Sequence, residues 1–276
     1  LSLGIELRKE EIFPMLLELL RSQGENIRGI YERNDVKIRE LEGMTENKGW
    51  FKPETVAGKT TVTEICENGI NYSVDVENGQ KTGFFLDQKY NRRAVARIAK
   101  GKHVLDCFTH TGAFALNAAA GGAASVTAVD VSAEAVRMTG INAEKNGFKD
   151  VVKPLEANVF DLLTELAEQK SHAYDFIILD PPAFTKSGST VKNAIRGYKE
   201  INLKAMKLLP RGGYLATCSC SHFMKEEYFV QMLKDAAKDA SVSLRQIEAR
   251  QQAPDHPVLW NVPETYYLKF YIFQVV

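Results

Sequence analysis

The sequence predicts an α/β protein built on a parallel sheet and preceded by a small α+β domain. The clearest signal is Val104 to Gly122, VLDCFTHTGAFALNAAAGG, where an apolar run, a turn of small and hydroxyl residues and an Ala-rich helix follow one another. From Lys81 onwards strand-like and helix-like segments alternate, which is typical of βαβ units. Earlier segments are short and interrupted by Gly and Asn-Gly. We therefore expect a small domain at residues 1–80 and the main domain at residues 81–276.

The first domain is expected to contain one helix and several short strands. Residues 10–21 include IFPMLLELL, an apolar-faced helix that tolerates Pro14 only in its first turn, and Gly24 marks its end. The pairs Asn68-Gly69 and Asn78-Gly79 lie between alternating residues and predict hairpins. The strand-like pieces are residues 27–33, 37–43, 61–69 and 71–79.

The main domain is expected to alternate strands with helices up to the C-terminus. The predicted strands are residues 103–108, 125–132, 151–160, 174–180, 212–221, 244–252 and 266–276. The first predicted helix ends near Gly101, and the second begins near Gly112. Further helices are predicted at residues 133–145, 161–169, 198–208 and 225–240. The last strand, aromatic and β-branched, is expected to insert into the sheet.

Composition and charge restrict the class of protein. Thirty-five basic residues balance thirty-five acidic ones, which counts mildly against a nucleic-acid binder but leaves room for a local basic groove. The sequence contains no apolar run long enough to cross a bilayer and no signal peptide. Its four cysteines form no CxxC pair and no zinc pattern, so we expect no metal site and a reducing, cytoplasmic setting.

Three polar positions at predicted strand ends indicate a nucleotide-like cofactor. The turn CFTHTG lacks the GxGxxG pattern, which disfavours a dinucleotide, while Thr109 offers a hydroxyl and Gly112 a close approach. Asp130 ends the second strand, where a carboxylate can accept both ribose hydroxyls. Asn158 ends the third strand and can read an adenine edge. The alternatives are an ordinary βα turn, and an acid placed at a helix N-terminus that Ser132 already caps.

The segment FIILDPPAF predicts a rigid turn at the end of a buried strand. Asp180 is followed by Pro181 and Pro182, which leave few free N–H groups. Such a turn can hold a flat, amino-bearing ring, with Asp180 accepting a hydrogen bond and Phe184 stacking on it. A stiff loop without a function is the alternative.

Two thiols follow the next strand, in CSCSH. Cys218 and Cys220 are two residues apart and are expected to face the same way. A cysteine beside a polar pocket can act as a nucleophile once its thiolate forms, whereas most cysteines are small buried apolar residues. Two thiols and His222 do not make a zinc site.

Taken together, VLDCFTHTGAF, VTAVDVS, ANVFDLL and FIILDPPAF resemble a class I S-adenosylmethionine-dependent methyltransferase. More narrowly, GQKTGFFLDQKYNRR, DPPAFTKSGS, RGYKEINLKAMKLL, CSCS and DHPVLWNVPETYYLK are similar to the ribosomal RNA large subunit methyltransferase I family, which makes 5-methylcytosine. The resemblance runs from about Tyr31 to the C-terminus and implies a Rossmann-like domain of seven strands. Such relatives begin with an RNA-binding PUA domain that is not visible here, and since the chain starts at Leu1, we expect it to be part of a longer protein.

The resemblance implies S-adenosylmethionine as the cofactor and assigns residues to it. These are Phe108, Thr109 and Gly112 for the methionine part, Asp130 for the ribose, Asn158 for the adenine amino group, and Gln88 and Arg92 in a segment expected to close over the cofactor.

The resemblance also implies a catalytic pair and a base pocket. Cys220 falls on the motif cysteine that acts as the nucleophile, and Cys218 is an additional thiol. Asp180 would bind the target base, with Pro181, Pro182 and Phe184 around it. A thiolate that adds to C6 of cytosine makes C5 able to accept a methyl group, so one difficult step becomes two easier ones.

The leading hypothesis is therefore an RNA cytosine-C5 methyltransferase that acts on large-subunit ribosomal RNA. A base N-methyltransferase of the same fold, such as a guanine-N7 enzyme, is the nearest alternative, because a ring nitrogen needs no thiol. A non-catalytic RNA-binding module and a nicotinamide dehydrogenase are disfavoured. RNA is the expected partner, and no association with a membrane is expected. Assembly into a homodimer is left open.

Overall fold

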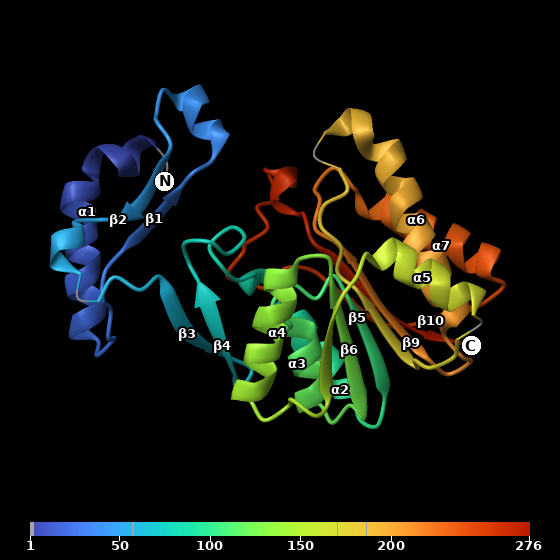
Figure 1. Cartoon of the computed structure of the whole chain (residues 1–276). Coiled ribbons are helices and arrows are strands. Elements are labelled where there is room, and N and C mark those ends of the chain that lie inside the picture. The colour runs from blue at the N-terminus through green and yellow to red at the C-terminus, as the bar shows by residue number, and fades with distance from the viewer. Residues whose placement is uncertain (1–2, 57, 170, 186) are drawn as a thin grey trace. The chain divides into compact units, whose positions relative to one another are not determined.

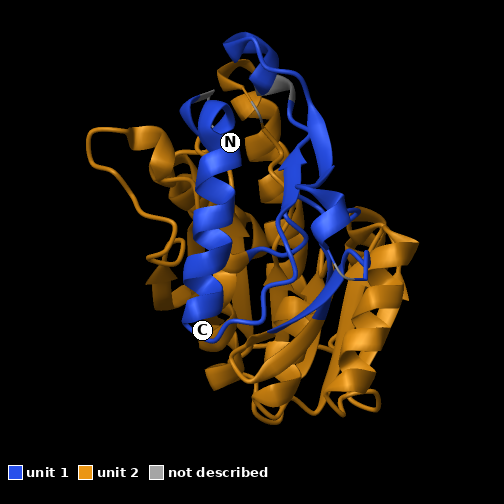
Figure 2. Cartoon of the chain, turned by 90° about the vertical axis from the view of Figure 1, so that its left-hand side faces the viewer, with its two compact units in different colours: residues 1–65, 73–85 blue, residues 66–72, 86–276 orange. Residues whose placement is uncertain are grey.

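The computed structural model describes residues 3–56, 58–169, 171–185 and 187–276. These residues form two compact units (Figure 2). Unit 1 contains Leu1–Ile65 and Ser73–Phe85, and unit 2 contains Cys66–Tyr72 and Leu86–Val276. The segment Cys66–Tyr72 thus packs with the larger unit, and the domain boundary expected at residue 80 stays a prediction.

Unit 1 begins with helix α1 (Leu3–Ser22), which is longer than expected and contains Pro14 in its interior. The expectation that Pro14 lies in the first turn was wrong, because the helix extends further towards the N-terminus. Strands β1 (Tyr31–Asn34) and β2 (Asn47–Trp50) pair in an antiparallel ladder. The strand expected at residues 37–43 was also wrong, since Lys37–Glu42 forms the 3₁₀ helix η1 and Gly43 ends it. A second 3₁₀ turn, η2, covers Pro53–Thr55.

The hairpin predicted at Asn68-Gly69 is confirmed. Strands β3 (Val62–Glu67) and β4 (Ile70–Asp75) pair with each other, and both turn residues have positive φ, 55° for Asn68 and 79° for Gly69. These backbone angles are those that a two-residue hairpin turn requires. Asn78-Gly79 lies in a turn after β4 and joins no second pair of strands among the described residues.

Unit 2 contains a mixed sheet of seven strands among the described residues, in the order β10-β11-β9-β8-β5-β6-β7. The parallel part consists of β5 (His103–Cys107), β6 (Ser125–Asp130), β7 (Val152–Glu156), β8 (Phe176–Leu179) and β9 (Tyr214–Ser219). Strand β11 (Lys269–Val275) inserts antiparallel between β9 and β10 (Leu244–Arg250), as the sequence predicted. The seven-stranded Rossmann-like architecture is thereby confirmed.

Helices cover both faces of this sheet (Figure 1). Helices α2 (Lys89–Ile98), α3 (Ala113–Ala120) and α4 (Ala133–Lys145) pack on one face, where buried residues of all three join one apolar cluster. Helices α5 (Val159–Glu168), α6 (Val191–Leu208) and α7 (Glu226–Ala240) pack on the other face around a second cluster. The short 3₁₀ turns η3, η4 and η5 are Leu86–Gln88, Gly188–Thr190 and Pro263–Thr265. In the part of the chain that the structure describes, no helix is both long and apolar enough to span a membrane.

The register of the parallel strands brings the predicted site to one edge of the sheet. Asp106 lies opposite Ile178 of β8, and Asp130 lies opposite Glu156 of β7, so these strands end at the same level. Open α/β sheets bind their ligands at this carboxyl edge. Because β11 runs antiparallel, its first residue Lys269 lies opposite Ser219 and belongs to the same edge.

Candidate active site

The turn between β5 and α3 has an unusual backbone. Phe108 and His110 have positive φ, 63° and 53°, and Gly112 has a φ of 86°. A Cβ atom at Gly112 would lie 2.6 Å from Leu116 Cδ1 and 2.8 Å from Thr139 Cγ2, so glycine is required both by conformation and by space. The turn therefore has a fixed shape, and a side chain at its last position would not fit.

Two aspartates anchor this turn from adjacent strands. The Thr109 hydroxyl donates to Asp106 Oδ2 at 2.6 Å, and the His110 amide donates to Asp130 Oδ2 at 2.9 Å. The Ser132 amide donates to Asp130 Oδ1, while the Ser132 hydroxyl caps α4 by accepting from an amide. Since Ser132 is the N-cap, the partly exposed carboxylate of Asp130 remains at the edge of the sheet with lone pairs for a ligand.

Asp106 is the most deeply buried acid of the site. Burial raises its pKa from the usual 3.8 to about 7, although the Thr109 hydroxyl opposes the shift. Its Oδ1 atom has no hydrogen bond of good geometry among the described residues, although the Ala115 amide lies close enough to lower the pKa. A buried oxygen of this kind needs a proton or a ligand donor.

An aromatic cluster lies beside the turn. The ring centroid of Phe108 is 6.4 Å from that of Phe160 and 6.4 Å from that of Phe184, and the latter two are 5.8 Å apart. Asn158 positions α5 as its N-cap, with Oδ1 accepting from the Phe160 amide at 2.9 Å. The side-chain oxygen of Asn158 that is expected to contact adenine therefore already accepts the hydrogen bond that caps α5.

The carboxylate of Asp180 is held by two neighbours. The Cys218 thiol donates to Asp180 Oδ1 at 2.8 Å, and Gln88 Nε2 donates to the same oxygen at 3.0 Å. Gln88 is fixed in turn by Asn91, whose Nδ2 donates to Gln88 Oε1 at 2.6 Å. Removal of the Asp180 carboxylate from water raises its pKa to about 6, and the nearby charge of Arg92 opposes that shift.

The two thiols differ in their surroundings. Cys218 is buried, and burial followed by the charge of Asp180 raises its pKa well above the usual value. Cys220 is partly exposed, and its Sγ atom lies 3.9 Å from the Pro181 carbonyl oxygen. Both sulfur atoms thus face the Asp-Pro-Pro turn, as the spacing predicted, but only Cys220 is accessible.

Buried hydrogen bonds fix the backbone on either side of Cys220. The Ser219 hydroxyl donates to Tyr198 Oη at 3.0 Å, and the Ser221 hydroxyl donates to the Thr185 carbonyl at 2.9 Å. The Lys269 ammonium donates to the Ser221 carbonyl at 2.6 Å. A partly exposed thiol is therefore held on a rigid segment.

Lys269 is the site residue that the sequence analysis missed. It is 1% exposed, and burial lowers its pKa to about 8, with the neighbouring Cys220 favouring its charged form. The available signal in the sequence was a lysine at the start of a mainly apolar strand, and its position opposite Ser219 is seen only in the folded sheet.

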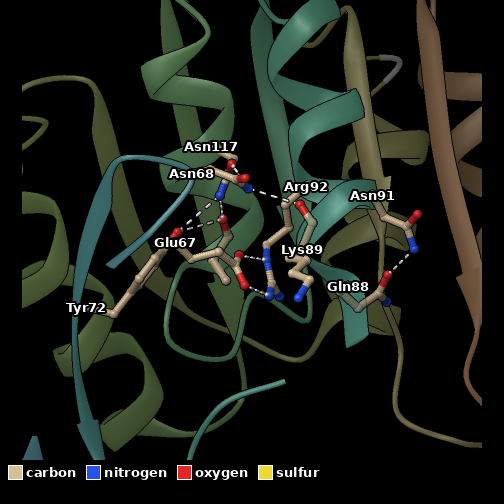
Figure 3. Close-up of polar contacts among 9 residues, drawn as sticks. Glu67, Asn68, Tyr72, Gln88, Lys89, Asn91, Arg92 and Asn117 are labelled. Carbon is tan, nitrogen blue, oxygen red and sulfur yellow. Dashed lines mark hydrogen bonds and ion pairs between the residues drawn. The ribbon is translucent and has the colours of Figure 1, made fainter. Parts of the chain in front are cut away.

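The segment with Gln88 and Arg92 makes contacts other than those expected. Arg92 is buried and forms two hydrogen bonds to Glu67, at 2.7 and 2.8 Å (Figure 3). Asn68 Nδ2 donates to the Lys89 carbonyl at 2.9 Å and to Asn117 Oδ1 at 3.1 Å. Arg92 thus joins the tip of the β3–β4 hairpin to α2, and closure of this segment over a cofactor stays a prediction.

Of the residues expected around the base, Pro181 is buried, Pro182 is exposed, and Phe184 is partly buried against Tyr198, with ring centroids 4.6 Å apart. The predicted residues from β5, β6, β8 and β9 therefore meet at one edge of the sheet. Among the described residues, no group of three or more His, Cys, Asp or Glu side chains could hold a metal ion.

Known proteins resemble this chain over most of its length. Residues 47–273 match the family model of S-adenosylmethionine-dependent methyltransferases. Ribosomal RNA large subunit methyltransferase I of Aeromonas salmonicida is 42% identical over 98% of this chain, which covers 66% of that protein. The Vibrio vulnificus protein of the same name is 41% identical over 100% of this chain and 68% of its own length. The chain thus spans about two thirds of these relatives.

Solved structures share the fold. A structure complexed with SAH, of a protein described as a methyltransferase, has a TM-score of 0.80 at 23% identity and covers 99% of this chain and 67% of that one. The tRNA m1G37 methyltransferase of M. jannaschii has a TM-score of 0.60 at 14% identity and covers 97% and 67%. At these identities the likeness concerns the fold alone. On its sequence relatives, the chain belongs to the S-adenosylmethionine-dependent methyltransferases, in the ribosomal RNA large subunit methyltransferase I family.

Proposed function

We propose that the chain transfers a methyl group from S-adenosylmethionine to C5 of a cytosine in large-subunit ribosomal RNA, with Cys220 as the nucleophile. The names of its relatives support ribosomal RNA as the substrate. One observation carries the chemistry: an accessible thiol, Cys220, and a carboxyl group, Asp180, end neighbouring strands with a buried ammonium nearby.

The residues at the β5–α3 turn fit the cofactor. Gly112 gives the turn the backbone shape that it needs, with a φ of 86°, Asp106 has a buried oxygen without a described partner, and Asp130 keeps lone pairs at the edge. Phe108 and Thr109 would then lie against the methionine part, with Asp130 at the ribose. Asn158 would lie at the adenine, and Gln88 and Arg92 belong to the segment proposed to close over the site. When bound, S-adenosylmethionine supplies an electrophilic methyl group on its sulfonium.

Cys220 starts the reaction in this proposal. Its thiolate adds to C6 of the cytosine, and the electron pair of the C5–C6 bond then makes C5 nucleophilic enough to accept the methyl group. The Lys269 ammonium, bonded to the Ser221 carbonyl, adds positive charge close to the thiolate. Removal of the C5 proton by a base restores the double bond and expels Cys220.

Asp180 stabilises the adduct. Because its pKa is about 6, both protonation states are accessible near neutral pH, so the carboxyl group can share a proton with N3 of the base. Cys218 and Gln88 both bind Oδ1, which leaves Oδ2 for the base. Pro181, Pro182 and Phe184 would form the walls of a pocket for a base that has been flipped out of its stack.

The test is nucleoside mass analysis of large-subunit ribosomal RNA from cells with and without the full-length gene. We expect the loss of one 5-methylcytidine, which a Cys220→Ala copy does not restore. A Cys66→Ala copy is the matched control, since Cys66 is an exposed thiol outside the site, and it should restore the modification. Full restoration of 5-methylcytidine by Cys220→Ala would exclude Cys220 as the nucleophile, whereas loss of a different methylated base would favour a base N-methyltransferase.

A further inference from the structure

A groove of about 760 Å³ lies beside the candidate active site in unit 2. It is lined by the end of β10, the start of α7 and the loop between β10 and β11, at residues 251–268 (red in Figure 1). The loop presents Trp260, which is 98% exposed, and the partly exposed Leu259 and Val262. A contiguous exposed apolar patch is typical of a binding surface, whereas scattered exposed apolar residues are not.

The loop is braced rather than loose. Leu259 N donates to Thr265 Oγ1 at 2.8 Å, and the same hydroxyl donates to the Val262 carbonyl at 2.7 Å. Gln252 Nε2 donates to the Thr265 carbonyl and its Oε1 accepts from the Leu268 amide. The backbone that carries Trp260 is therefore braced, and its indole ring is presented to the solvent.

The groove continues the carboxyl edge of the sheet past Cys220. Arg250 lies opposite Phe270 of β11, and Lys269 lies opposite Ser219 of β9. Tyr266, on the wall of the groove, has its ring centre 5.7 Å from Lys269 Nζ, the atom that binds the Ser221 carbonyl. A strand spacing of about 4.8 Å places the groove within one or two strands of the thiol.

The polar groups of the groove suit a phosphodiester chain. The side chain of Arg250 is 31% exposed, and its Nη1 atom forms an ion pair with Glu248 at 3.2 Å. Glu226, an acid in the wall of the groove, accepts a hydrogen bond from Tyr271 Oη. The groove thus combines an aromatic face, a partly exposed guanidinium group and an acid that accepts a hydrogen bond from a phenol.

We propose that this groove holds a single-stranded RNA nucleotide next to the target base, with its base stacked on Trp260 and its phosphate bound by Arg250. The inference rests on the proposed function, since it assigns a second contact for the same RNA. A base that enters the pocket leaves its stack, so its neighbour loses a stacking partner that Trp260 replaces. Stacking on an aromatic side chain accepts any base and adds affinity without sequence selection.

Tryptophan fluorescence tests this directly, because the chain contains two tryptophans, Trp50 and Trp260. In a Trp50→Phe variant, Trp260 is the single reporter. An unstructured RNA oligonucleotide should quench its emission in a saturable manner. Trp260→Ala should weaken RNA binding by about 5- to 100-fold, the range that one stacked base supports. Trp260→Phe should recover most of the affinity, and S-adenosylmethionine should bind equally well to all variants.

Ile141→Ala is the control, since Ile141 is an exposed apolar residue on α4 outside the groove, and its RNA affinity should be unchanged. Unaltered RNA affinity in Trp260→Ala, with no quenching in Trp50→Phe, would overturn the inference and indicate a protein occupant instead. Methylation of the RNA without any change in Trp260 emission would refute the proposed role of the groove and leave the proposed chemistry intact. Quenching without 5-methylcytidine formation would refute the proposed chemistry and leave the groove intact.

Discussion

At the scale of single residues, the site depends on three buried or partly buried ionisable groups with different tasks. Asp106 accepts a hydrogen bond from the turn proposed to face the cofactor, Asp180 accepts one from Cys218 and is proposed to face the base, and Lys269 donates to the backbone of the segment that carries Cys220. Burial is the first cause of the pKa shift in all three, which is how such sites obtain proton exchange near neutral pH.

Lys269 is predicted to promote the thiolate of Cys220. Replacing it by Met removes a positive charge from a buried position, so the thiolate becomes less favourable and alkylation of Cys220 should slow. The pH profile of the alkylation rate should move upwards by about 1 unit. Mass spectrometry of iodoacetamide-treated protein measures this. Cys66 serves as the internal reference, and Lys269→Arg keeps the charge. An unchanged profile in Lys269→Met would remove Lys269 from the mechanism.

Asp106 is predicted to make stability depend on pH. Its folded pKa of about 7 lies above the usual 3.8, so the folded chain binds the proton more tightly than the unfolded chain. Its contribution to stability is full below about pH 4 and is lost as the pH rises through about 7. Relative to Asp106→Asn, the wild type should lose about 2–4 kcal/mol over this range in denaturant unfolding. Exposed Asp150→Asn is the control, and an identical pH profile in Asp106→Asn contradicts the assignment.

At the scale of elements, the tip of the β3–β4 hairpin is joined to α2 and α3. The Asn68-Gly69 turn could be predicted from sequence because a two-residue turn is a local property. The packing of this turn against α2 and α3 could not be predicted, because the hydrogen bonds between Glu67 and Arg92 and between Asn68 and Asn117 connect residues far apart in the chain. The 3₁₀ helix at Lys37–Glu42 was missed because six residues carry too little periodicity to separate it from a strand.

Glu67→Gln is predicted to destabilise the chain by about 3–5 kcal/mol, because it leaves the buried guanidinium of Arg92 without its carboxylate. Denaturant unfolding gives the difference. Glu134→Gln removes the carboxylate of an exposed pair with Arg137 and should cost less than about 1 kcal/mol. Equal effects of the two substitutions would show that the Glu67–Arg92 pair is not a structural anchor.

At the scale of the whole molecule, the sequence predicted the sheet, its inserted last strand and the edge at which the site lies, because alternating patterns and strand-end residues are local signals. Asp180 could be named in advance for the same reason, whereas Cys220 was assigned as the nucleophile through the resemblance of its motif to a known family. The bonds of Cys218 and Gln88 to Asp180, the buried Lys269 and the Trp260 groove depend on packing between β8, β9, β10 and β11. Such contacts are set only when the strands are ordered in space.

The central claim is covalent catalysis by Cys220, and an RNA that carries 5-fluorocytidine at the target position tests it most directly. Fluorine replaces the C5 proton, so the base cannot be released after methyl transfer and the thioether should persist. We predict a covalent protein–RNA adduct that requires S-adenosylmethionine and that fragmentation mass spectrometry locates at Cys220. An adduct at Cys218 would contradict the assignment of the nucleophile, and the absence of any adduct from an RNA that is methylated in its unfluorinated form would contradict covalent catalysis.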